Sequence, residues 1–268
     1  MSAAVKKLLF DGHVHVYPCY DWRVAVRALV HNLGRFDGGD AVLLGFLAEG
    51  SGSGFLREVR ENPERYRDDG LALEPSTDPG AVMVKMEDQV KGYLIAGRQI
   101  VTAERLEVLA IGTDVDLPDG EPVKVTLARV RASGAAAVLS WSPGKWFSGR
   151  GRTVRRLLDD ERAGVFLLGD TALRPMGWPF PFLMALGRRR GFKVIGGSDP
   201  LPLPGEERRI GTYGVSVRAV FDESAPAVSV QRMLAYGNVF FTPVGARLCP
   251  LTFVRKWIAN ERGRKDKP

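Results

Sequence analysis

Residues 10–18 read FDGHVHVYP, and this stretch holds two of the three histidines in a chain of 268 residues. Side chains alternate across a β-strand, so His13 and His15 point to one face, together with Asp11. At the end of a strand that faces a cavity, two imidazoles can bind one metal ion, and Asp11 can ligate that ion or fix a histidine tautomer. The alternative interpretation is a pair of interior histidines hydrogen-bonded to their neighbours.

The segments around this stretch alternate between short apolar runs and helical patterns. This order predicts an α/β fold with a mostly parallel sheet and enough strands to close a barrel. We expect strands at residues 7–16, 41–47, 81–85, 93–101, 107–111, 135–139, 165–168, 192–196 and 214–220. The clearest helix runs from Trp22 to Leu33, with Asp21 as its N-cap and Gly34 at its end. His31 lies on the polar face of this helix, so we expect it at the surface.

Composition limits the classes of protein that the chain can belong to. The 45% of hydrophobic and 26% of charged residues are typical of a globular protein, and the length suffices for one large core. We expect a barrel over residues 1–224 and a helical extension packed on it over residues 225–268. Two cysteines are too few for a disulfide framework, and no stretch reads as a secretory signal or a membrane span, so we expect a cytoplasmic protein.

The net charge of +7 and the isoelectric point of about 9.6 indicate anionic partners. These include phosphorylated small molecules, nucleic acid and an acidic membrane surface. No nucleic-acid-binding motif is present, so we do not expect nucleic acid as a partner. The last helical pattern leaves a choice between docking on the barrel and peripheral contact with an anionic membrane. Its apolar residues are Leu251, Val254, Trp257 and Ile258.

Four segments resemble, in order, the motifs of the polymerase-and-histidinol-phosphatase (PHP) superfamily, which are metal-dependent phosphoesterases built on a distorted (β/α) barrel. DGHVH at residues 11–15 resembles the opening Asp-x-His-x-His. Residues 96–112 look like the middle segment, residues 132–143 are similar to the Ala-His-Pro strand, and residues 196–211 resemble the Gly-Ser-Asp-x-His strand end. The resemblance implies a barrel of PHP type that binds a divalent metal such as zinc, manganese or iron.

Several metal-ligand positions of that superfamily are occupied by other residue types in this chain. Gln99 stands where the superfamily has a glutamate, and Glu107 stands where it has a histidine. Trp141 lies at or beside the histidine of Ala-His-Pro, and Leu201 replaces the histidine of the last motif. After the second strand, Glu49 alone is left to replace a Thr-Asp-His motif.

The residues that remain of the ligand set are His13, His15 and Asp199. Three protein ligands and a water satisfy a catalytic zinc site, so a centre with one metal is chemically possible. Glu107 or Glu49 can supply a fourth oxygen or act as the general base.

Candidate substrate-binding residues follow the same strands. Arg208 and Arg209 come one loop after Asp199 and can hold a phosphate, or they can pair with the neighbouring glutamates. Lys145 and Trp141 stand near the predicted mouth of the barrel, where an indole can stack on a sugar or base or can serve in packing.

Two functions are consistent with these residues. The first is a metal-dependent hydrolase, a phosphoesterase, that acts on an anionic small molecule through a reduced metal site. The second is a catalytically inactive PHP-like binding or scaffold protein for an anionic ligand.

Overall fold

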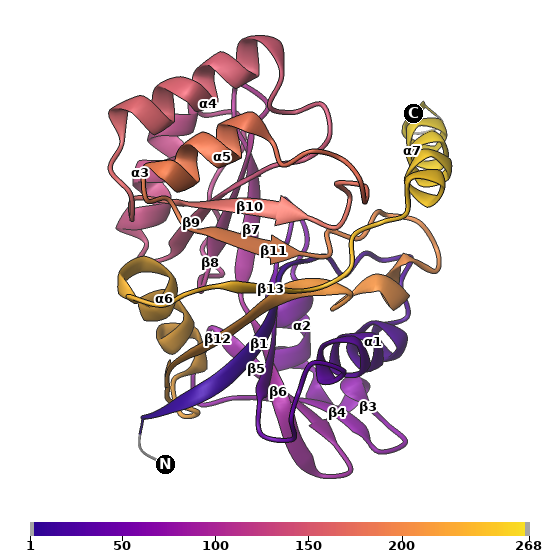
Figure 1. Cartoon of the computed structure of the whole chain (residues 1–268). Helices are drawn as coiled ribbons and strands as arrows, with labels where there is room; N and C mark the ends of the chain where they lie inside the picture. Colours follow the sequence, from indigo (N-terminus) through magenta and orange to yellow (C-terminus); the bar gives the residue numbers. More distant parts are fainter. Residues whose placement is uncertain (1–2, 266–268) are drawn as a thin grey trace.

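Two β-sheets form the centre of the computed structural model, which describes residues 3–265 (Figure 1). The larger sheet has eight strands in the order β13-β12-β1-β2-β6-β5-β4-β3, and the smaller sheet has five in the order β11-β10-β9-β8-β7. The larger sheet consists of β1 Ala4–Val14, β2 Val42–Leu47, β3 Arg67–Asp68, β4 Leu71–Pro75, β5 Ala81–Met86, β6 Gln89–Ile95, β12 Tyr213–Phe221 and β13 Thr242–Gly245. The smaller sheet consists of β7 Gly97–Val101, β8 Glu107–Ile111, β9 Ala136–Ser140, β10 Leu167–Thr171 and β11 Val194–Gly197.

Strand β1 lies inside the larger sheet, parallel to β2 and antiparallel to β12. Leu8 and Phe10 belong to one core cluster, and Leu9 belongs to another on the opposite face of the sheet. Both faces are covered, which explains why this part of the strand is a continuous apolar run. Because β1 crosses the core, its carboxyl end carries His13 and His15 into the interior, where both are buried.

The two sheets meet where β1 packs against β11, and a backbone hydrogen bond of 2.9 Å joins Asp199 N to His13 O there. A single bridge between Glu49 and Arg98 links the sheets at a second point. Within residues 3–265 the strand ladders do not close, so the structure has two sheets where the sequence predicted a barrel.

Antiparallel pairings outnumber parallel ones among the described residues, which corrects the expected mostly parallel sheet. The reason is local. Strands β3 to β6 and strands β7 and β8 follow one another through short turns, and such connections allow only antiparallel neighbours.

Most of the helices cover the outer faces of the two sheets. Their bounds are α1 Trp22–Gly34, α2 Phe55–Glu61, α3 Val123–Ala132, α4 Ser148–Asp160, α5 Phe182–Arg189, α6 Pro226–Tyr236 and α7 Pro250–Lys265, with 3₁₀ turns η1 Pro63–Tyr66 and η2 Glu206–Arg209. Figure 1 shows α3, α4 and α5 grouped beside the smaller sheet, and α7 at the edge of the molecule. None of the helices in the described part of the chain combines the length and the apolar character needed to span a bilayer.

The predicted first helix is confirmed as α1. Asp21 caps it, because its carboxylate accepts a hydrogen bond of 2.8 Å from the backbone N–H of Arg23. The apolar face packs on the larger sheet through residues such as Leu29 and Leu33. His31 is exposed on the opposite face, as expected.

Each predicted strand overlaps an observed one, but one prediction joined two strands. Residues 93–101 contain the end of β6 and the whole of β7, with Ala96 between them. The chain leaves the larger sheet at that residue and enters the smaller one, and because only one residue separates the two strands, the sequence shows no loop between them. The short strands β3, β4 and β13 were not predicted.

The segment after residue 224 is joined to the rest of the molecule at several places. Ala227, Val230 and Met233 of α6 belong to the same core cluster as Leu8 of β1. Strand β13 extends the larger sheet beside β12. The expected helical extension therefore contains a strand, and its first helix packs in the main core.

Candidate metal centre

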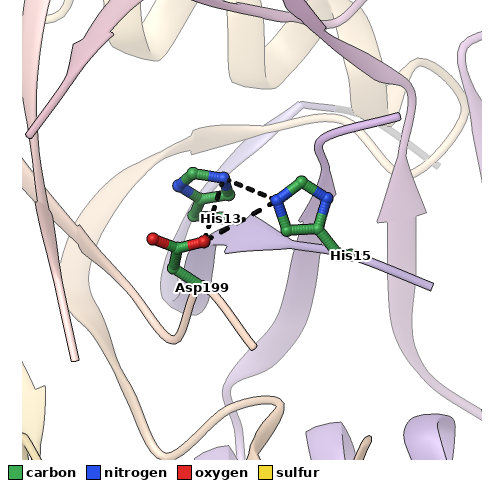
Figure 2. A group of neighbouring side chains, drawn as sticks. All are labelled: His13, His15 and Asp199. Atoms are coloured by element: carbon green, nitrogen blue, oxygen red, sulfur yellow. Dashed lines mark hydrogen bonds and ion pairs between the residues drawn. The ribbon is translucent and has the colours of Figure 1, made fainter. Parts of the chain in front are cut away.

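The two histidines of the opening motif lie side by side at the carboxyl end of β1 (Figure 2). The Nε2 atoms of His13 and His15 are 3.0 Å apart. Residue 14 points to the other face of the strand and packs in the core around α1. The alternation predicted from the sequence therefore brings both imidazoles to one point.

Asp199 joins these histidines from the loop that follows β11. Its backbone has a φ of +47°, and its N–H donates to His13 O, so the turn aims the side chain back toward β1. The Oδ1 atom lies 3.6 Å from Nε2 of His13 and 3.7 Å from Nε2 of His15. Figure 2 shows the three side chains converging on one space.

The separations between these three donor atoms fit a single ion. A tetrahedral site with ligand bonds of about 2.1 Å has edges of about 3.4 Å, and the observed edges are 3.0, 3.6 and 3.7 Å. Two imidazole nitrogens and one carboxylate oxygen are also a donor set that zinc and related divalent metals accept. Among the described residues, this is the one group of at least three such donors close enough to share an ion.

Burial sets the protonation of the three side chains. Desolvation lowers the pKa of His13 to about 4 and that of His15 to about 4. Both imidazoles are therefore neutral near pH 7 and have a lone pair to offer a metal. Burial raises the pKa of Asp199 to about 6, and the charge of Glu107 acts in the same direction. The carboxylate is still mostly ionised at pH 7, as a metal ligand must be.

Gln99 of β7 adds an amide oxygen to the group. Its Oε1 atom lies 3.0 Å from Nε2 of His13, the atom that faces His15. On the other side of the same ring, Ser140 Oγ lies 3.5 Å from Nδ1. From the sequence, Gln99 stands in place of a charged glutamate ligand. In the structure its amide still places an uncharged oxygen donor at this position.

Asp11, which was expected from the sequence either to bind the ion or to hold a histidine, is fixed by backbone hydrogen bonds. Its Oδ1 atom accepts hydrogen bonds from the backbone N–H of His13 at 3.1 Å and of Ser198 at 2.8 Å. Its Oδ2 atom accepts from the N–H of Gly211 at 2.7 Å. Both oxygens are therefore used to tie β1 to the loops around β11 and β12, so Asp11 positions the histidines and is not among the donors. Its full burial raises its pKa to about 6 despite these hydrogen bonds.

Glu107 and Lys145 form an ion pair in the wall of the cavity that His15 and Asp199 line. Glu107 begins β8, and Lys145 follows β9, so the two predicted residues meet from different strands. Ser142 lies beside them, with its Oγ 3.5 Å from Oε2 of Glu107. A carboxylate and an ammonium group thus stand together at the site.

Glu49 faces a neighbouring cavity. Its Oε1 atom accepts from the backbone N–H of Leu56 at 3.2 Å, so the carboxylate caps the start of α2. Burial raises its pKa. This cavity shares His15 and Tyr17 with the one that His15 and Asp199 line, but the donor group itself does not include Glu49 among residues 3–265.

The predicted substrate-binding residues divide into those at the cavity and those away from it. Trp141 is 1% exposed and packs in the core of the smaller sheet, so its indole is not available for stacking. Arg208 is exposed, and Arg209 lies 3.7 Å from the buried Glu206. Neither arginine is among the described residues that line the cavity, whereas Lys145 is.

The cavity lined by His15 and Asp199, two of the three donors, has a volume of about 370 Å³. We call it the donor cavity. One wall comes from the loops after β1 and β11, and another comes from the last helix, through Phe253 and Trp257 of α7. An ion pair between Lys256 and the buried Glu206 fastens this helix to η2. The last helix therefore docks over the site, which was one of its two predicted arrangements.

Two residues next to the donors were missed from the sequence. Thr171 ends β10, and its hydroxyl donates to Oδ2 of Asp199 at 3.2 Å. Tyr17 stacks on His15 with 5.0 Å between the ring centroids. Thr171 could have been found as a polar residue at the end of an apolar strand. Tyr17 could have been found because it lies two residues after His15 in the sequence.

Comparisons with known proteins agree with this geometry at the level of the fold. No protein-family model and no curated protein matches the sequence. The structure is similar to PsfC from Pseudomonas syringae, with a TM-score of 0.59 and 16% identity over 96% of this chain and 99% of that protein. The fold is PHP-like, as the fold of PsfC is.

Two further solved structures are more distant. A lesion-specific endonuclease Q from Pyrococcus furiosus aligns with a TM-score of 0.47 and 10% identity over 89% of this chain and 59% of that one. An endonuclease Q in complex with a 27-mer duplex that carries an abasic lesion aligns with a TM-score of 0.45 and 10% identity, over 91% of this chain and 60% of that one.

Proposed function

We propose that this chain is a metal-dependent hydrolase that cleaves a phosphoester through a single divalent ion. The observation that carries the proposal is the convergence of His13, His15 and Asp199, whose donor atoms are separated by the distances that a single four-coordinate ion requires. A divalent ion held there would polarise a phosphoryl oxygen and make a water more acidic. The PHP-like fold is consistent with this chemistry.

The chain's own residues would have distinct tasks in this reaction. Gln99 would orient the His13 ring, or contribute its amide oxygen to the ion. Glu107 is the carboxylate of the donor cavity that we assign as general base, and Ser142 beside it would orient the substrate or the water. Lys145 would neutralise negative charge on the phosphoryl group, the task predicted for Arg208 and Arg209.

The test is elemental analysis of protein purified without a polyhistidine tag. We expect about one equivalent of zinc, manganese or iron per chain in the wild type, and none in His13→Ala. His31→Ala is the matched control, because that imidazole is exposed on α1 and should leave the metal content unchanged. A wild-type protein that binds none of these metals, even after incubation with them, would rule the proposal out.

A binding or scaffold function is the second candidate, and the pairing of Glu107 with Lys145 favours it. In this pair one oxygen of the carboxylate contacts the ammonium group of Lys145, so that oxygen is occupied when a water would have to give up its proton. The two candidate functions differ in whether the metal-loaded protein turns over a phosphoester. Hydrolysis of bis(4-nitrophenyl) phosphate by the metal-loaded wild type, lost in Glu107→Gln, supports the hydrolase, whereas metal content without turnover of this ester or of 4-nitrophenyl phosphate supports the binding protein.

A further inference from the structure

A second cavity adjoins the donor cavity and has a different chemical character. It has a volume of about 560 Å³ and lies between the loop after β1, the loop Glu49–Gly54 and the helices α1 and α2. We call it the aromatic chamber, because five aromatic side chains line it. These are Tyr17, Tyr20, Trp22, Phe55 and Tyr66.

The rings of the aromatic chamber hold one another in place. Tyr66 is in contact with Trp22 at 5.3 Å between centroids and with Phe55 at 5.5 Å. On the other side, Tyr20 meets the edge of Tyr17 at 5.3 Å. Tyr66 is buried, while the other four rings are only half-buried and so present surface to the cavity. Pre-arranged rings of this kind bind a flat apolar group at low entropic cost.

The two cavities share a wall that belongs to the donor group. His15 and Tyr17 line both, and their rings are stacked with an interplanar angle of 22°. The hydroxyl of Tyr20, which lines the aromatic chamber, donates to the carbonyl of Leu201, which lines the donor cavity. This hydrogen bond links the walls of the two cavities. The donor cavity and the aromatic chamber therefore border the same two side chains, His15 and Tyr17.

The donor cavity is the less suitable of the two for an apolar ring. The charged groups Glu107, Lys145 and Asp199 lie in its wall, and an apolar ring would have to displace their water. The aromatic chamber has two carboxylates in its lining. Glu58 there is exposed, and the carboxylate of Glu49 is occupied by the start of α2. A volume of about 560 Å³ also falls in the range of pockets for small organic ligands.

We infer that the aromatic chamber binds a flat aromatic group of the substrate while the ester lies at His13, His15 and Asp199. The substrate class is thus an aryl or heteroaromatic phosphoester, in which the ring and the phosphoryl group occupy adjacent cavities. This inference rests on the proposed function for the ester half. The predicted binding of the aromatic group depends on the aromatic chamber alone.

The test is calorimetric titration of the full-length, zinc-loaded Glu107→Gln variant, which should bind the ester without hydrolysing it, with three probes, which are 1-naphthyl phosphate, 1-naphthol and inorganic phosphate; the further substitutions below are made in this variant. We expect 1-naphthyl phosphate to bind more tightly than either of the other two. Phe55→Ala should weaken both naphthyl probes at least about tenfold, because stacked rings contribute that much to affinity, and should leave inorganic phosphate unchanged. Phe182→Ala is the matched control, since that ring is 70% exposed at the start of α5.

The probes also separate this inference from the proposed function. If the metal centre is absent, inorganic phosphate fails to bind, but 1-naphthol still binds and still responds to Phe55→Ala. If Phe55→Ala does not fold, Ser53→Trp takes its place, because this exposed residue lines the chamber and a large side chain there would fill it. Naphthyl binding that is unaffected by both variants, or that is lost in Trp257→Ala instead, overturns the inference.

Discussion

The hydroxyl of Thr171 donates to Oδ2 of Asp199 at 3.2 Å and thereby leaves Oδ1 of the same carboxylate to face the two histidines. Thr171 ends β10, and Asp199 follows β11, the next strand of the smaller sheet. The donor group is therefore assembled from both sheets, with His13 and His15 from the larger one and the oriented carboxylate from the smaller one.

Thr171→Val should weaken metal binding without unfolding the chain. The methyl group is close in size to the hydroxyl, but it cannot hold Oδ2, so Asp199 gains rotational freedom. Loss of such a supporting hydrogen bond typically lowers metal affinity about 10- to 100-fold. Competition with a chromophoric chelator measures this change, and Thr242→Val on the exposed strand β13 is the control. Equal affinities in the two variants would show that Thr171 does not position the carboxylate.

Metal affinity should fall as the pH falls below about 6. The pKa of Asp199 is raised to about 6 by burial, so protons compete with the metal for its carboxylate below that pH. The histidine pKa values of about 4 add further competition only in more acidic solution. We expect affinity to be nearly constant from pH 7 to 8, to drop about tenfold per pH unit between 6 and 4, and to drop more steeply below 4. Calorimetry over this range checks the profile, and a constant affinity from pH 5 to 7 would contradict a role for Asp199.

Gly197→Ala should disrupt the junction between the two sheets. A Cβ atom at this residue would lie 2.5 Å from the Cβ and backbone nitrogen of His13, and backbone atoms cannot move aside without displacing the imidazole. We expect a loss of about 1–3 kcal/mol in the free energy of unfolding, together with loss of bound metal. Urea denaturation and elemental analysis measure the two effects. Gly34→Ala is the control, because a Cβ atom at the end of α1 meets open space.

Asp170→Asn should lower stability through a network behind the site. Asp170 accepts hydrogen bonds from Nε of Arg174 at 2.8 Å, from Nη2 of Arg174 at 2.6 Å and from the hydroxyl of Tyr213 at 2.8 Å. All three side chains are buried. Removing the charge leaves the buried guanidinium without a counter-charge, at a cost of about 3–5 kcal/mol.

The free energy of unfolding in urea measures the effect of Asp170→Asn, and Arg67→Ala serves as the comparison. Arg67 pairs with Glu74 at 2.7 Å but its side chain is 62% exposed, so this variant should lose about 1 kcal/mol or less. Similar losses in the two variants would mean that the network around Asp170 is worth no more than a surface ion pair.

Much of the secondary structure could be predicted because it depends on local patterns. The apolar spacing and the Asp21 cap predicted α1, and each expected strand overlaps an observed strand. The alternation of side chains along β1 likewise predicted that His13 and His15 share one face. The arrangement of the strands could not be predicted in the same way, since the break at Ala96 between two consecutive strands depends on which sheet each strand joins.

The roles of individual polar residues depended on the tertiary structure. Trp141 and Lys145 follow the same strand, yet one is in the core and the other lies in the donor cavity. Asp11 and Asp199 are both buried carboxylates near the histidines, but only Asp199 has an oxygen left to face them. In each pair, contacts with residues from distant parts of the chain decide which side chain lies at the site.

The amino-acid sequence by itself determined the elements of the fold and the residue types at their ends, because backbone preference and hydrophobic period act over a few residues. Only the tertiary structure decided that an imidazole pair from the first strand and a carboxylate 184 residues after His15 meet in one space. That meeting depends on the packing of β1 against β11, where Gly197 leaves room for His13, and such a contact between distant segments is set by the complete core.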